Sequence, residues 1–191
     1  MERYDLATSM INIPNCLTFL RITVVPLLVI VLLSREKTTD LWAALLFSFG
    51  SLTDFLDGYY ARKYDRVTTF GKFMDPIADK MLIISAFIML VHLDRIPGWM
   101  VVIFVGREMA VTGLRVIVVG EGTLIPVSKL GKKKTVLQVS AIIPLILHYP
   151  YIGIDFHAVG IFFLWIALGF TIWSGLDYFI TFFNSIRKGN K

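Results

Sequence analysis

Six long apolar segments, separated by short charged connections, constrain the fold of this chain more than any other feature. They cover about residues 16–33, 41–60, 75–93, 98–119, 135–148 and 158–183. A helix needs roughly 20 apolar residues to cross a bilayer, and it satisfies its own backbone hydrogen bonds there. The fifth segment is shorter and could extend back through residues 132–134, because lysine side chains can reach the bilayer surface. The pattern predicts an all-α, polytopic membrane protein with six transmembrane helices, built as a single domain over residues 1–191.

The composition agrees with a membrane protein. Hydrophobic residues make up 56% of the chain and the mean hydropathy is +0.71, whereas soluble domains average roughly 45–50% apolar. The net charge of +5 is modest and the lysines are not interleaved with aromatic residues, so no nucleic-acid partner is expected. Residues 1–13 mix apolar and charged side chains, which predicts a short helix in the membrane interface. No transit peptide is visible there, which favours the inner membrane of a bacterium.

Basic residues predict the orientation of the chain. Of the nineteen lysines and arginines, twelve fall in alternate connections on one side: Arg3, Arg62, Lys63, Arg66, Lys72, Lys129, Lys132, Lys133, Lys134, Arg187, Lys188 and Lys191. The opposite side holds Arg35, Lys37 and Arg95. Because cytoplasmic loops carry the excess of basic residues, both termini are expected in the cytoplasm.

Four aspartates lie where the second segment ends and the third begins, on the cytoplasmic side. Asp54 and Asp57 are three residues apart, and Asp75 and Asp79 are four apart, so each pair shares one face of its helix. Carboxylates crowded together repel each other unless cations lie between them. Oxygen ligands of this kind suit Mg²⁺, Mn²⁺ or Ca²⁺ rather than zinc. The pattern predicts a divalent-metal site at the cytoplasmic mouth of these helices.

Small and basic residues continue the same two helix faces. Gly58, Ala61 and Arg62 follow the first pair of aspartates, and Gly71 precedes the second pair. Small residues let a ligand approach the backbone closely, and an arginine attracts an anion. The acidic residues can bind a metal ion, the small residues let a ligand approach, and the basic residues attract an anion. Together they indicate a site that binds phosphate groups.

The combined motif resembles that of a known enzyme family. Asp54-x2-Asp57-Gly58-x2-Ala61-Arg62-x8-Gly71-x3-Asp75-x3-Asp79 matches the signature of the CDP-alcohol phosphatidyltransferases in every residue and spacing. The resemblance implies an enzyme with six transmembrane helices, usually a homodimer. It also implies two Mg²⁺ or Mn²⁺ ions and the displacement of CMP from a CDP-linked lipid by an alcohol.

The resemblance also implies roles for single residues. The metals would be bound by Asp54, Asp57, Asp75 and Asp79, and Asp79 would also be the catalytic base on the acceptor hydroxyl. The residues expected to bind the CDP-lipid are Asn15, Asp57, Gly58, Ala61, Arg62, Thr68, Gly71 and Lys72.

Three further segments indicate which alcohol is used. NIPNCLTFLR (12–21), GREMAVTGLR (106–115) and SKLGKKKT (128–135) resemble segments of the phosphatidylglycerophosphate synthases, a branch of that family. Their donor is CDP-diacylglycerol and their acceptor, sn-glycerol 3-phosphate, is a dianion that needs fixed positive charge. We expect its phosphate to be bound by Arg107, Arg115, Lys132 and Lys134. Glu108 is expected to pair with one of the arginines or with Lys80.

Alternatives remain open from the sequence. The same chemistry could use inositol phosphate, serine or phosphatidylglycerol, although serine has less need of the arginine pair. A divalent-cation transporter would spread its acids along a path through the bilayer, whereas these four lie near one face. His92, His148 and His157 are scattered along the sequence and no metal site is expected there. The sixth segment is expected to add only hydrophobicity.

Overall fold

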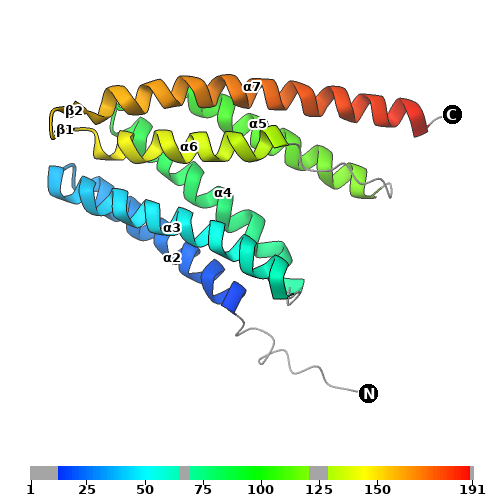
Figure 1. Cartoon of the computed structure of the whole chain (residues 1–191), viewed down its shortest axis with the longest axis horizontal. Coiled ribbons are helices and arrows are strands. Elements are labelled where there is room, and N and C mark those ends of the chain that lie inside the picture. Colours follow the sequence, from blue (N-terminus) through cyan, green and yellow to red (C-terminus); the bar gives the residue numbers. More distant parts are fainter. Residues whose placement is uncertain (1–12, 65–68, 121–128, 190–191) are drawn as a thin grey trace, which may run out of the picture. The chain divides into compact units, whose positions relative to one another are not determined.

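Six helices make up most of the described residues (Figure 1). The computed structural model describes residues 13–64, 69–120 and 129–189, with side chains over 19–53, 77–78, 80–114, 131 and 133–182. The helices are α2 (Ile13–Leu33), α3 (Lys37–Tyr64), α4 (Thr69–His92), α5 (Gly98–Gly120), α6 (Lys129–Leu147) and α7 (Phe156–Gly189). The strands β1 (Pro150–Tyr151) and β2 (Ile154–Asp155) form a short antiparallel hairpin before α7. The all-α class and the six predicted helices are confirmed, while the predicted interfacial helix falls outside the described residues except for Ile13.

Helices α4 and α6 begin furthest ahead of the predicted apolar segments. Helix α4 begins at Thr69 rather than near residue 75, and α6 begins at Lys129 rather than near residue 135. Hydropathy detects only the apolar part of a helix, and both of these helices start with a polar turn. The predicted extension of the fifth helix back through its lysines is therefore confirmed.

One helix among the described residues is long and apolar enough to cross a membrane by itself. It is the 27-residue stretch Phe156–Phe182 of α7. Shorter apolar stretches occur in α2, over Phe19–Leu33, and in α4, over Lys80–His92. The count of six transmembrane helices remains a prediction.

The chain divides into two compact units, Met1–Leu90 and Val91–Lys191. In the first, α2 and α3 pack side by side (Figure 1). The three-residue connection between them reverses the chain, and Arg35 adopts a left-handed φ of 54° there. Leu28, Leu32 and Phe47 are fully buried and form part of the core.

Gly50 brings the helices of the first unit close together. A Cβ atom at this position of α3 would lie 2.9 Å from Leu82 Cδ2 of α4 and 3.4 Å from Val24 Cγ1 of α2. A Cβ atom here would have to displace the end of the Leu82 side chain, whereas glycine leaves the approach open. Gly50 lies one helical turn before Asp54, so the tight packing directly precedes the acidic motif.

In the second unit, α6 and α7 form the most extensive helix pair, joined by the short hairpin (Figure 1). Arg95 is 6% exposed, and its Nη1 atom donates to the carbonyl oxygens of Leu145 at 3.2 Å and Ile146 at 2.6 Å. These carbonyls belong to the last turn of α6, which has no further helical donors. Asp155 Oδ1 accepts from the backbone N–H of Ala158 at 3.1 Å and caps the start of α7.

Candidate active site

The acidic motif lies on two consecutive helices of the first unit. Asp54, Asp57, Gly58, Ala61 and Arg62 belong to α3, and Gly71, Lys72, Asp75 and Asp79 belong to α4. Because the backbone is helical throughout both stretches, the positions within each pair of aspartates fall on one side of their helix. The predicted placement of the motif on helices is confirmed.

Two described residues directly before motif aspartates are buried. Ala78 of α4, directly before Asp79, has no exposed surface, and Thr53 of α3, directly before Asp54, is 5% exposed. The hydroxyl of Thr53 donates to the carbonyl oxygen of Phe49 at 2.7 Å, so its hydrogen bond is made within α3. The side chains of the four aspartates are outside the described set, and their roles as ligands and base remain predictions.

The motif has the donor chemistry that a divalent ion needs. Its four aspartates supply carboxylate oxygens, the ligand type preferred by Mg²⁺ and Mn²⁺. The close approach of α3 and α4 at Gly50 and Leu82 keeps the two helices that carry them in one packed unit. Among the side chains that the structure describes, no group of three or more His, Cys, Asp or Glu could hold a metal ion.

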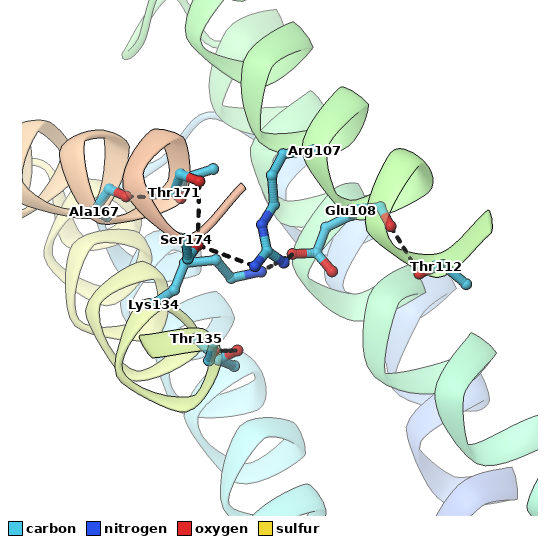
Figure 2. Close-up of polar contacts among 9 residues, drawn as sticks. Arg107, Glu108, Thr112, Lys134, Thr135, Ala167, Thr171 and Ser174 are labelled. Atoms are coloured by element: carbon cyan, nitrogen blue, oxygen red, sulfur yellow. Dashed lines mark hydrogen bonds and ion pairs between the residues drawn. The ribbon is translucent and has the colours of Figure 1, made fainter. Parts of the chain in front are cut away.

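Three charged residues form a cluster in the second unit, where α5, α6 and α7 meet (Figure 2). Glu108 Oε1 accepts from Arg107 Nη1 at 3.3 Å and forms an ion pair with Lys134 Nζ. Figure 2 shows the Glu108 carboxylate facing both cationic groups, which lie next to each other. The Arg107, Glu108 and Lys134 side chains are 12%, 19% and 4% exposed. We call these three residues the charged cluster.

The cluster joins two segments that the sequence assigned to the acceptor. Arg107 and Glu108 come from the GRE segment on α5, and Lys134 comes from the GKKKT segment at the start of α6. The expected pairing of Glu108 with an arginine is confirmed for Arg107. The ion pair with Lys134 was not predicted, because no spacing rule connects residues 26 positions apart on different helices.

Other predicted site residues are placed only by their helix. Asn15 belongs to α2, Arg115 to α5 and Lys132 to α6, and their side chains are outside the described set. Thr68 lies outside the described residues altogether. Of the four residues expected at the acceptor phosphate, the structure thus brings Arg107 and Lys134 together around one carboxylate.

Helix α7 contributes to the cluster, contrary to the expectation that it adds only hydrophobicity. Arg107 Nη2 donates to Ser174 Oγ at 3.0 Å. A Cβ atom on Gly175 would lie 3.2 Å from Arg107 Cγ. Neither residue stands out in the sequence, since a serine and a glycine are common inside apolar helices.

Two of the three histidines, which are far apart from the third in the sequence, are neighbours in the structure, a contact that the sequence did not predict. Their Nδ1 atoms, on His148 and His157, lie 3.2 Å apart, and their rings meet edge to face. The hairpin β1–β2 reverses the chain between them and brings the end of α6 to the start of α7. One imidazole can donate an N–H to the other, so the pair closes this end of the helix hairpin.

Comparison with known proteins identifies the family. The sequence profile of the CDP-alcohol phosphatidyltransferases matches residues 11–173, which include all the helices described above except the end of α7. The chain belongs to this family. The match runs through both compact units, so the acidic motif and the charged cluster are parts of one family domain.

Individual relatives carry names within the family. A protein of Bacillus subtilis named CDP-diacylglycerol–glycerol-3-phosphate 3-phosphatidyltransferase is 41% identical over 95% of this chain and 100% of its own length. A protein of the same name from Rickettsia felis is 43% identical over 88% of this chain and 93% of its own length. A probable phosphatidylglycerophosphate synthase of Mycobacterium tuberculosis is 38% identical over 87% of this chain and 79% of its own length.

Proposed function

We propose that this chain transfers the phosphatidyl group of CDP-diacylglycerol to sn-glycerol 3-phosphate, giving phosphatidylglycerophosphate and CMP. The observation that carries the proposal is the charged cluster, which places two cations from the acceptor segments around one carboxylate. The names of the relatives support the same reaction. The four aspartates of the family motif supply the other half of the chemistry.

The acceptor phosphate would bind to the cations of α5 and α6. Glu108 offsets one of the two positive charges of Arg107 and Lys134, which leaves one net positive charge in the cluster. Arg115 and Lys132, on the same two helices, would supply the rest of the charge that a dianion needs. Cations with little exposure attract a phosphate strongly, because water screens them weakly.

The reaction proceeds through the aspartates and a direct displacement. Asp79 accepts the proton of the primary hydroxyl of glycerol 3-phosphate. The hydroxyl oxygen forms a bond to the β-phosphorus of CDP-diacylglycerol. The bond from that phosphorus to the bridging oxygen breaks, and CMP leaves with this oxygen. No covalent enzyme intermediate is needed.

The donor would bind at the motif helices. Asp54, Asp57, Asp75 and Asp79 would hold two Mg²⁺ or Mn²⁺ ions, which when bound neutralise the charge of the diphosphate. Gly58, Ala61 and Gly71 leave room for the nucleotide next to the backbone. The polar residues proposed to contact the cytidine and the phosphates are Asn15, Arg62, Thr68 and Lys72.

The proposed setting is a bacterial inner membrane, with the active site on the cytoplasmic side and the protein as a homodimer. Large apolar side chains are exposed on the helices, for example Ile30 (63%), Val102 (70%) and Trp173 (69%). Water disfavours such surfaces, whereas lipid does not. The apolar stretch of α7 is 27 residues long, about 40 Å at 1.5 Å per residue, enough for a core of roughly 30 Å.

An acceptor comparison tests the proposal. The purified protein in detergent with CDP-diacylglycerol and Mg²⁺ should release CMP with glycerol 3-phosphate, and not with myo-inositol 1-phosphate or serine. Release with another acceptor alone would preserve the chemistry at the aspartates and contradict the substrate. No release with any acceptor, from folded protein, would contradict the enzyme proposal and favour a cation site.

A further inference from the structure

Helix α7 is apolar for most of its length but carries a small polar patch that faces Arg107. Thr171, Ser174 and Gly175 are spaced three and four residues apart, so they lie on one side of the helix. Thr171 and Ser174 have no exposed surface, and Gly175 is also buried. We call Ser174 and Gly175 the arginine seat.

The hydroxyl of Ser174 is oriented by its own helix. Its O–H donates to the carbonyl oxygen of Thr171 at 3.1 Å. With its single proton used there, the oxygen presents its lone pairs to other donors. Arg107 Nη2 is such a donor, at 3.0 Å (Figure 2). The contact is therefore directional, and it is set by the backbone of α7.

Gly175 gives the arginine side chain room to pass α7. A Cβ atom at this position would lie 3.2 Å from Arg107 Cγ, which is closer than about nine in ten real contacts of a Cβ atom. An alanine would therefore require the arginine side chain to shift by a few tenths of an ångström. A shift at Cγ is carried to the guanidinium group at the end of the side chain.

The guanidinium is thus fixed from two directions. Ser174 of α7 holds Nη2, and Glu108 of α5 holds Nη1 at 3.3 Å. The carboxylate of Glu108 is itself fixed by Lys134 of α6. Arginine presents several donors in a rigid plane, so two fixed contacts determine the direction of the others.

We propose that Ser174 and Gly175 are positioning residues for the acceptor: they hold the Arg107 guanidinium where it meets the phosphate of glycerol 3-phosphate. The inference rests on the proposed function, because it takes Arg107 as an acceptor ligand. It adds α7 to the binding machinery, which the family motif and the acceptor segments do not include.

Substitution of Ser174 tests the hydrogen bond. Ser174→Ala should raise KM for glycerol 3-phosphate about tenfold, since a hydrogen bond to a charged group is lost. KM for CDP-diacylglycerol should stay within about twofold, and Ser174→Thr should recover most of the loss because it keeps the hydroxyl. Thr171→Val is the matched control: it removes a buried hydroxyl that bonds only to Ala167 of the same helix, at 2.7 Å. It should leave both KM values unchanged.

Substitution of Gly175 tests the packing independently. Gly175→Ala should raise KM for glycerol 3-phosphate, whereas Gly169→Ala on the same helix should not, because nothing lies within 4 Å of a Cβ atom there. Thermal unfolding in detergent is measured for each variant. If Ser174→Ala does not fold, the Gly175→Ala and Gly169→Ala pair decides the question.

A double-mutant cycle separates a positioning role from a general structural one. In an Arg107→Ala background, Ser174→Ala should change KM for the acceptor by less than about twofold, because the seat acts only through Arg107. Equal losses for both substrates, or a full Ser174 effect without Arg107, would overturn the inference and leave the proposed function intact. Failure of the unmodified protein to use glycerol 3-phosphate would overturn the proposed function, and the acceptor role of the seat with it.

Discussion

Glu108 is the residue that organises the described part of the site. It is the acid that joins Arg107 of α5 to Lys134 of α6, and it is 19% exposed. A partly buried carboxylate between two cations keeps both in place and limits their repulsion. The acceptor phosphate would then meet cations whose positions are set before it binds, which reduces the entropy lost on binding.

Removal of this negative charge should destabilise the protein. Glu108→Gln keeps the size of the side chain but removes the negative charge that pairs with Lys134, whose side chain is 4% exposed. We expect the free energy of unfolding to fall by about 3 kcal/mol, the low end for breaking a buried ion pair. Denaturation in detergent measures the change.

A second substitution isolates the charge. Glu108→Gln with Lys134→Met removes both charges of the Glu108–Lys134 pair, so part of the lost stability should return; the ion pair between Glu108 and Arg107 is still broken in this variant. Activity with glycerol 3-phosphate should stay low, because Lys134 is a proposed acceptor ligand. An unchanged stability of Glu108→Gln alone would contradict the view that the ion pair holds α5 to α6.

Asp79 carries the most specific chemical prediction. Asp79→Asn should lower kcat at least about a hundredfold, the usual contribution of a general base. Mg²⁺-dependent binding of CDP should be affected much less, since the side chain keeps one oxygen and the other three aspartates remain. A kcat near that of the unmodified protein would show that another group removes the proton.

At the residue scale, the sequence predicts chemistry better than contacts. It singled out Arg107 as a charged residue in an apolar segment and Lys134 through the SKLGKKKT segment, while their roles at the acceptor remain predictions. It missed Ser174, whose contact with Arg107 joins residues 67 positions apart. It also missed the His148–His157 pair, which exists only because the hairpin folds back. Such contacts depend on how helices pack, and no local pattern encodes that.

At the element scale, the pairing of α6 and α7 depends on one close approach. A Cβ atom on Gly160 of α7 would lie 2.6 Å from Leu145 Cγ and 2.9 Å from the Leu145 backbone nitrogen of α6. A backbone atom cannot move aside as a flexible side chain can. Gly160 therefore sets the distance between the two helices near the hairpin.

Two glycine substitutions on α7 should change stability in opposite directions. Gly160→Ala should lower the melting temperature, because overpacking costs roughly 1–3 kcal/mol. Gly169→Ala should raise it slightly, because alanine gains about 1 kcal/mol of helix propensity and the site is open. Thermal unfolding of both variants in one detergent gives the comparison. A stable Gly160→Ala would mean that α6 and α7 pack less tightly here.

The helices themselves were the most predictable level of the structure. All six apolar segments are helical, and at the starts of the helices the largest errors are those of α4 and α6. Hydropathy cannot locate a polar first turn, since its residues resemble those of a loop. The left-handed Ile152 (φ 53°) and Gly153 (φ 76°) of the hairpin were likewise not predicted. A β-branched residue such as isoleucine rarely adopts this conformation.

At the scale of the whole molecule, the proposed chemistry is divided between two compact units. The four aspartates belong to the first unit and the charged cluster belongs to the second. The family profile runs through both. The sequence could assign the aspartates and the charged cluster to one reaction because their motifs occur in order along the chain. Helical periodicity alone would not connect these two groups of residues.

The orientation of the second unit in the membrane can be tested with single cysteines. Cys16 is the only cysteine, so Cys16→Ala provides a cysteine-free background. Lys133, near the start of α6, is exposed, and Ile152, in the hairpin beyond its end, is fully exposed. If α6 crosses the bilayer with its lysines in the cytoplasm, a membrane-impermeant maleimide should label Ile152→Cys from outside intact spheroplasts. It should label Lys133→Cys only in inverted vesicles.

Labelling after detergent solubilisation is the control, because both cysteines should then react equally. CMP release by each variant shows that the fold is kept, since neither residue belongs to the proposed site. Labelling of both cysteines from the same side would mean that α6 does not span the membrane. Labelling with the sides exchanged would place the lysine-rich start of α6, and with it Lys134 of the acceptor site, outside the cytoplasm. Glycerol 3-phosphate is a charged molecule that does not cross lipid unaided, so that result would also contradict the proposed access of the acceptor from the cytoplasm.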